Sequence, residues 1–225
     1  MRRVSRAEWG AKPPRHVTRL RRSRSLTVHY FGPHLHIPSH SHCANVVWGI
    51  QDFHMRPPPE GGRGWADIAY SFLACPHGYI FEGRGWGRRT AANGTNEGNS
   101  DGHAVMAMIG EGQEPPPEMW AAIRNLYAES GAEVMLPHSH WKPTDCPGDP
   151  LRQLIADAAR SASDRGPDGS EDAMTPEQEA KLDELLTVAR HNKAKIDHFE
   201  LELDMLRRGV RGLVEDEAAP VVDGP

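Results

Sequence analysis

Short apolar segments alternate with helix-patterned segments along the first 160 residues, and this alternation constrains the fold more than any other feature of the chain. The apolar segments have the length and character of buried strands. They are residues 26–31 (LTVHYF), 68–74 (IAYSFLA), 104–109 and 134–136, with residues 79–81 as the expected hairpin partner of 68–74. Strands that alternate with helices predict an α/β fold in which helices flank a mixed central sheet.

Three segments carry apolar residues at the three- and four-residue steps of a helix. Residues 43–54 do so with Val46, Val47, Ile50 and Phe53. Residues 117–130 begin with proline and are followed by Gly131, which is typical of a helix start and a helix end. A third helix is expected to begin at Asp149 as its N-cap, with Pro150 in its first turn.

The composition changes sharply near residue 161 and divides the chain. We predict a catalytic domain over residues 1–160 and a polar linker over 161–175. Residues 176–214 are predicted to form one long helix, and residues 215–225 a flexible tail.

The long helix carries a heptad pattern that indicates a coiled coil. Its seam consists of Leu182, Leu185, Ala189, Asn192, Ile196, Phe199, Leu203, Leu206, Val210 and Leu213. A lone helix would leave this stripe in water, so we expect a homo-oligomer assembled through residues 176–208. The alternative is that the stripe folds back onto the first domain of its own chain.

Composition and charge exclude several classes of protein. The net charge is -5, which gives no reason to expect a nucleic-acid partner. No apolar run is long enough for a membrane span, and the basic start lacks the apolar core of a secretory signal peptide. The three cysteines are an odd number, which argues against a disulfide framework and favours a reduced, cytoplasmic setting.

Three residues have the chemistry of a catalytic zinc site: His29, His138 and Cys146. Such a site uses three protein ligands, imidazoles or thiolates among them, and leaves one position open for water. His29 lies in a predicted strand, and His138 and Cys146 are joined by a loop that can bring both side chains to one point. His140 competes with His138 for the same role.

A second histidine-rich segment is a rival metal site. It holds His34, His36, His40, His42 and Cys43. A loop of this composition can bind zinc, or it can be exposed and line a substrate groove. Cys43 and Cys75 are otherwise expected to be unpaired and inert, and His54 and His77 to have no functional role.

Four motifs in a fixed order carry a resemblance to a known family. They are SRAEWGA near the start, His29, WADIAYSF at residues 65–72, and His138 followed by TDCPG at residues 144–148. In this order they resemble the type 2 N-acetylmuramoyl-L-alanine amidases, which share their fold with peptidoglycan recognition proteins. The resemblance covers residues 5–160 and implies the amidase/peptidoglycan-recognition fold.

The resemblance also implies a function. One Zn²⁺ per chain would be held by His29, His138 and Cys146, and the enzyme would hydrolyse the amide bond between N-acetylmuramic acid and L-alanine in peptidoglycan. Tyr70 matches the catalytic tyrosine, which would orient the water or assist proton transfer. Thr144 matches a position where the family has lysine or threonine, and it is a candidate donor to the oxyanion.

The missing signal peptide and the predicted coiled coil make the chain look like a bacteriophage endolysin. Such a protein would stay in the cytoplasm of the host bacterium until its release to the cell wall. The alternative is a non-catalytic peptidoglycan-binding module on the same fold, oligomerised by its coiled coil. Non-catalytic relatives typically lose the metal cysteine, and Cys146 is present.

Weaker indications concern substrate contacts. Residues 83–102 are rich in glycine and asparagine and offer donors suited to a sugar-peptide ligand, or they are a plain connector. Trp65, Asn99 and His103 are the residues expected to touch the substrate.

Overall fold

The computed structural model describes residues 2–16, 18–20 and 23–163. The chain divides into two compact units, Met1–Gly166 and Pro167–Pro225, and every described residue belongs to the first unit. The predicted coiled coil, the tail and all of the predicted linker after residue 163 lie outside the described residues, so those expectations stay predictions.

A mixed six-stranded sheet forms the centre of the first unit, in the order β1-β4-β3-β5-β2-β6. Its strands are β1 (Arg2–Val4), β2 (Ser25–Gly32), β3 (Phe72–Ala74), β4 (Tyr79–Glu82), β5 (Gly102–Gly110) and β6 (Val134–Pro137). β3 and β4 form the predicted antiparallel hairpin, and the other neighbouring strands are parallel. The predicted mixed sheet is confirmed, and β1 is a strand that the sequence did not reveal.

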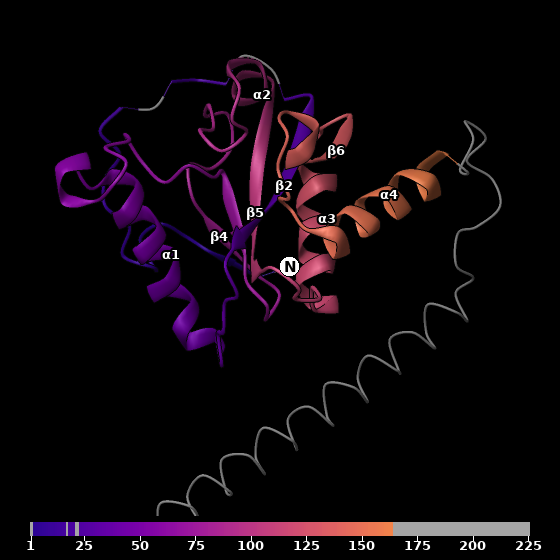
Figure 1. Ribbon diagram of the computed structural model, residues 1–225, viewed down its shortest axis with the longest axis horizontal. Coiled ribbons are helices and arrows are strands. Elements are labelled where there is room, and N and C mark those ends of the chain that lie inside the picture. Colours follow the sequence, from indigo (N-terminus) through magenta and orange to yellow (C-terminus); the bar gives the residue numbers. More distant parts are fainter. Residues whose placement is uncertain (1, 17, 21–22, 164–225) are drawn as a thin grey trace, which may run out of the picture. The chain divides into compact units, whose positions relative to one another are not determined.

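Helices cover both faces of this sheet, as predicted. They are α1 (His40–Met55), α2 (Asn96–Asp101), α3 (Pro117–Ser130) and α4 (Asp149–Ser163), with short 3-10 turns η1 (Pro58–Glu60) and η2 (His138–His140). In Figure 1, α1 lies on one side of the sheet, and α3 and α4 lie on the other. α4 continues to Ser163, so its last residues occupy the first positions of the predicted linker. Among the described helices, none combines the length and apolar character that a bilayer crossing needs.

The central strand β5 shows why the sheet is buried on both faces. All nine of its residues are buried, and its apolar run is typical of a parallel strand covered by helices on each side. α3 covers one face with Met119, Ala122, Ile123 and Leu126. That helix ends at Gly131, whose positive φ of 63° suits glycine.

Two local expectations were wrong in detail. The buried stripe of α1 includes Cys43, Val47, Ile50 and His54 rather than Phe53, whose side chain is 41% exposed. Cys43, Val47, Ile50 and His54 follow one another in steps of four, three and four residues, so they lie on one face of the helix. The buried face therefore includes a cysteine and a histidine, whereas the apolar pattern alone predicted Val46 and Phe53. The strand predicted at residues 68–74 begins only at Phe72.

A buried carboxylate explains the late start of β3. The Asp67 side chain accepts hydrogen bonds from the Ile68 backbone, from Gln51 at 2.7 Å, and from the Arg6 guanidinium at 3.0 and 3.2 Å. These bonds hold the segment before β3 in a loop, because the side chain takes the Ile68 N–H, a backbone donor that a strand would use in its ladder.

Candidate metal centre

Three segments bring His29, His138 and Cys146 together at the carboxyl ends of parallel strands. His29 lies on β2, and Val28 of that strand pairs with Pro137, the last residue of β6. His138 follows at the start of η2, so the two histidines occupy neighbouring positions with ring centroids 4.3 Å apart. Cys146 lies in the loop before α4, with its Sγ 3.8 Å from Nδ1 of His29. The three ligand atoms all lie within 4.8 Å of one another.

The geometry at His29 and Cys146 is that of two ligands of one metal ion. In a tetrahedral zinc site, sulfur and nitrogen ligands of the same ion are about 3.6 Å apart. The separation of 3.8 Å between Cys146 Sγ and His29 Nδ1 is close to this value. Neither ring nitrogen of His138 makes a hydrogen bond of normal geometry among the described residues, although both atoms are buried and the Asn93 backbone lies nearby. Because buried polar atoms are normally satisfied, the free nitrogens of His138 fit a bound metal.

Asn93 fixes the orientation of His29 and was not identified from the sequence. Its Oδ1 lies 2.9 Å from Nε2 of His29. Its Nδ2 donates to the carbonyl of Gly98 at 2.7 Å, which sets the direction of the amide. An amide oxygen only accepts, so Nε2 of His29 carries the hydrogen and Nδ1 presents its lone pair towards Cys146. The only sequence signal for Asn93 was its position in an asparagine-rich loop.

The protonation of the three residues suits a cation. Burial lowers the pKa of His29 to about 3, and the neighbouring His138 adds to this effect. Burial also lowers the pKa of His138 to about 4, assisted by the positive charge of Lys142. Both imidazoles are therefore neutral at pH 7 and free to donate lone pairs. Burial raises the pKa of the Cys146 thiol to about 11, so its thiolate needs the compensating charge that a metal ion supplies.

Tyr70 lies beside His29, in the loop before β3 rather than within a strand. Its ring centroid is 5.4 Å from that of His29, in an edge-to-face arrangement. Burial raises the pKa of Tyr70, and the nearby Cys146 acts in the same direction. The phenol is therefore protonated at neutral pH and offers a hydrogen-bond donor.

Thr144 contacts the loop that carries Cys146. Its Oγ1 accepts a hydrogen bond of 3.3 Å from the Cys146 backbone N–H. This bond closes a short turn and helps to fix the cysteine. The competing histidine, His140, is exposed and packs edge-on against Trp141 at 4.9 Å, and it does not belong to the three-residue cluster.

The three predicted substrate contacts lie in different surroundings. Trp65 is partly buried and stacks on His54 at 4.9 Å, and the ring of His54 is 5.9 Å from that of Tyr70. Asn99 supports Asn93, because its Oδ1 accepts from the Asn93 backbone at 2.9 Å.

His103 is not at the candidate centre. Its side chain is only 2% exposed and is hydrogen-bonded to Ser71, and it lies in β5 opposite Leu26, three residues before His29 along the strand. Three residues span about 10 Å of a strand, so His103 lies outside the cluster of His29, His138 and Cys146.

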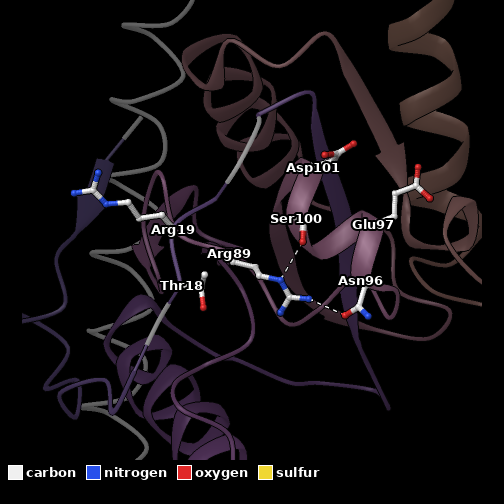
Figure 2. A pocket seen from close by; sticks show the side chains of 7 residues that line it. All are labelled: Thr18, Arg19, Arg89, Asn96, Glu97, Ser100 and Asp101. Carbon is white, nitrogen blue, oxygen red and sulfur yellow. Dashed lines mark hydrogen bonds between the residues drawn. The ribbon is translucent and has the colours of Figure 1, made fainter.

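A pocket of ≈ 550 Å³ lies beside α2 (Figure 2). It is lined by Thr18, Arg19, Arg89, Asn96, Glu97, Ser100 and Asp101. In this pocket the Arg89 side chain reaches Ser100 Oγ at 3.1 Å and Asn96 Oδ1 at 3.0 Å. None of the three clustered ligand residues lines it. Arg89 thus ties the loop before α2 to α2 itself, whose Gly98 and Asn99 support Asn93.

The rival histidine-rich segment does not form one site. His34, His36 and His42 are exposed, whereas His40 and Cys43 lie on the first turn of α1. These two face Cys75 and His77, which were expected to be inert or without a role.

Comparisons with known proteins identify the family of the chain. No family model matches it. It is 30% identical over 162 residues to peptidoglycan recognition protein 1 of Bos indicus. The aligned region covers 68% of this chain and 81% of that protein. It is 29% identical over 163 residues to an N-acetylmuramoyl-L-alanine amidase of Sus scrofa, with 67% of this chain covered. The chain spans about a quarter of the length of that amidase, 26%.

The fold points the same way. The wild-type PGRP-LB structure from Drosophila matches with a TM-score of 0.60 and 27% identity, over 77% of this chain and 99% of that chain. Sequence, fold and the order of the motifs agree. The chain therefore belongs to the family of peptidoglycan recognition proteins and N-acetylmuramoyl-L-alanine amidases.

Proposed function

We propose that this chain is a zinc-dependent amidase that hydrolyses the bond between N-acetylmuramic acid and L-alanine in peptidoglycan. One observation carries the proposal: the ligand atoms of His29, His138 and Cys146 lie within 4.8 Å of one another. Three protein ligands leave the fourth position of a tetrahedral ion open, which is the arrangement of catalytic rather than structural zinc.

The residues around the centre would divide the work of amide hydrolysis. Zinc, when bound, supplies Lewis acidity towards water and the amide carbonyl. Asn93 keeps His29 in the tautomer whose Nδ1 lone pair would be available to a bound ion. Tyr70 carries a protonated phenol next to His29, in a position to orient water or to move a proton to the leaving amine.

The side chain of Thr144 supports the loop that carries Cys146 and keeps its hydroxyl hydrogen available as a donor. Its Oγ1 is engaged with the Cys146 backbone. We assign stabilisation of the developing negative charge to the hydroxyls of Tyr70 and Thr144, and a bound zinc ion would assist them. A Thr144→Val variant would lose the hydrogen bond and keep the shape of the side chain.

The second candidate is peptidoglycan binding without cleavage. It is favoured by relatives named for recognition rather than for hydrolysis, such as the Bos indicus protein. The intact set of His29, His138 and Cys146 favours the enzyme, because binding alone does not need a metal site with an open position.

Metal removal on a soluble substrate separates the two candidates. Purified protein is incubated with a muramyl peptide, and the release of new primary amine is measured before chelation, after chelation and after zinc is restored. An amidase loses amine release on chelation and regains it with zinc. A binding module releases no amine in any state, while peptidoglycan still retains it in a sedimentation assay.

The biological setting is the finer part of the proposal. We propose a role in bacteriophage-induced lysis of the host cell, with the protein held in the cytoplasm until it reaches the wall. Expression inside a bacterium, with and without a membrane-permeabilising protein, tests this. Lysis only after permeabilisation is the expected result, and unchanged turbidity in both cultures would exclude an endolysin role.

A further inference from the structure

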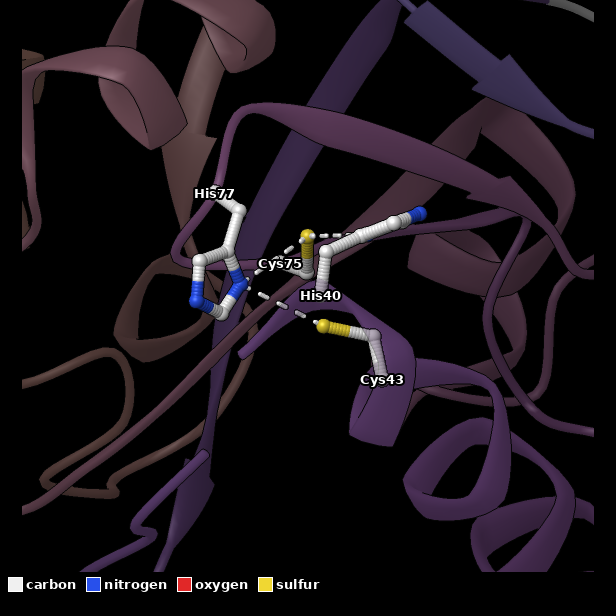
Figure 3. A group of neighbouring side chains, drawn as sticks. All are labelled: His40, Cys43, Cys75 and His77. Carbon is white, nitrogen blue, oxygen red and sulfur yellow. Dashed lines mark hydrogen bonds between the residues drawn. The ribbon is translucent and has the colours of Figure 1, made fainter. Parts of the chain in front are cut away.

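A second cluster of potential metal ligands lies away from His29 and uses none of its residues. It consists of His40 and Cys43 on the first turn of α1, and Cys75 and His77 in the turn between β3 and β4. Figure 3 shows the two sulfur atoms and the His77 ring converging between the helix and the turn. Both cysteines are 0% exposed, so the thiols lie inside the protein.

The distances in this cluster match a tetrahedral metal site with four protein ligands. Cys43 Sγ is 3.5 Å from His77 Nδ1, and Cys75 Sγ is 3.8 Å from His40 Nδ1 and 3.9 Å from His77 Nδ1. All four ligand atoms lie within 4.8 Å of one another. Sulfur and nitrogen ligands of one tetrahedral zinc ion are about 3.6 Å apart, so three independent separations agree with a common centre.

The surroundings hold the ligands in place. The ring of His40 stacks on that of Tyr79, with centroids 3.5 Å apart and planes at 17°. The Cys75 backbone N–H donates to the Tyr79 carbonyl at 2.9 Å, and Gly78 donates to the Cys75 carbonyl at 3.1 Å, which closes the turn. A rigid turn and a helix start therefore present two ligands each.

The chemistry of the four side chains also fits a metal ion. Both cysteines are buried, and a cysteine binds a metal ion as its thiolate. A thiolate in a dry interior is costly unless a cation compensates it. Two sulfur and two nitrogen ligands in tetrahedral geometry select zinc among the common divalent ions.

We propose that His40, Cys43, Cys75 and His77 bind a structural zinc ion that ties the start of α1 to the β3–β4 hairpin. All four positions are filled by protein, so no position is left open for water or substrate. The ion would join two segments that are distant in sequence. It would also give both buried cysteines a structural role as ligands. The site is independent of the proposed amidase activity.

The decisive experiment counts zinc in a variant that lacks the first site. Full-length Cys146→Ala protein keeps all four ligands of the second site and is expected to retain one zinc per chain, against two in the parent. The variant Cys43→Ala/Cys75→Ala is expected to lose one zinc per chain and to keep the ion at His29. A Ser41→Ala/His42→Ala variant, which alters exposed neighbours on the same turn, should keep both ions.

Spectroscopy and thiol chemistry complete the test. Cobalt bound to Cys146→Ala protein should give the intense thiolate-to-metal absorption of a two-sulfur site, and both cysteines should resist alkylation until a chelator is added. A zinc-free Cys146→Ala protein would overturn the proposal, whether its mass shows a Cys43–Cys75 disulfide or two free thiols. This outcome is decisive even if the double-cysteine variant does not fold.

Discussion

Replacing Asn93 with alanine tests how the protein prepares His29 for metal. The side chain is 0% exposed and makes two hydrogen bonds, to His29 Nε2 at 2.9 Å and to the Gly98 carbonyl at 2.7 Å. Alanine leaves the Nε2–H of His29 buried without an acceptor, which costs about 1–3 kcal/mol. The loss of such a supporting partner typically weakens metal binding by about 10–100-fold.

The assay is a zinc competition against a chromogenic chelator, with an unfolding midpoint measured on the same samples. Background from the second proposed site is removed by carrying out the comparison in Cys43→Ala/Cys75→Ala protein. Asn125→Ala serves as the matched control, because that asparagine is exposed on α3. Asn125→Ala is expected to keep the zinc affinity of its parent. If the zinc affinity of Asn93→Ala also stays within about threefold of the parent value, Asn93 does not position His29, and the argument from its hydrogen bonds fails.

Three further predictions follow from the site and the sequence. Tyr70→Phe should keep the fold and the zinc content while turnover falls by about 10²–10⁴-fold, and an unchanged rate would make Tyr70 structural only. Burial lowers the pKa of both His54 and His103 to about 4 in the folded protein, against an ordinary value of 6.5. The unfolded chain therefore binds more protons between pH 6.5 and 4, and the free energy of unfolding of metal-free protein should fall as the pH falls through that window. Urea titrations at pH 7, 6 and 5 measure this, and a flat profile would contradict it. Deleting everything after Gly166 should convert an oligomer into an active monomer, which light scattering tests, since the predicted assembly uses residues 176–208.

Segments with a strong local pattern were predictable from the sequence. α3 was predicted with its observed limits because proline marks its first turn and Gly131 its end, and β5 because its apolar run is continuous. β1 was not predictable, because Arg2 and Arg3 have no strand pattern and become a strand only by pairing with β4. The short helix α2 lies in a segment rich in glycine and asparagine, and it depends on Thr95, whose side chain accepts from the Gly98 backbone.

The metal residues differ in how they could be found. The order of His29, His138 and Cys146 along the chain, joined to the TDCPG motif, indicated one site, and the structure brings these residues into contact range. Asn93 and the pairing of Cys43 with Cys75 depend on contacts between distant segments, which no local spacing encodes. A histidine-rich segment drew attention to His40 and Cys43, but their partners on the hairpin turn became visible only in three dimensions.

The most direct test of the central claim is to identify the bond that the protein cuts. Defined muropeptides are digested with the parent protein and with Cys146→Ala, and the products are identified by mass spectrometry. Our account predicts two products from the parent: a glycan with a free lactyl carboxylate, and a stem peptide with a free L-alanine amino group. It predicts neither from Cys146→Ala. Cleavage within the glycan or within the peptide would contradict this account. So would a substrate that fully zinc-loaded protein binds and leaves intact.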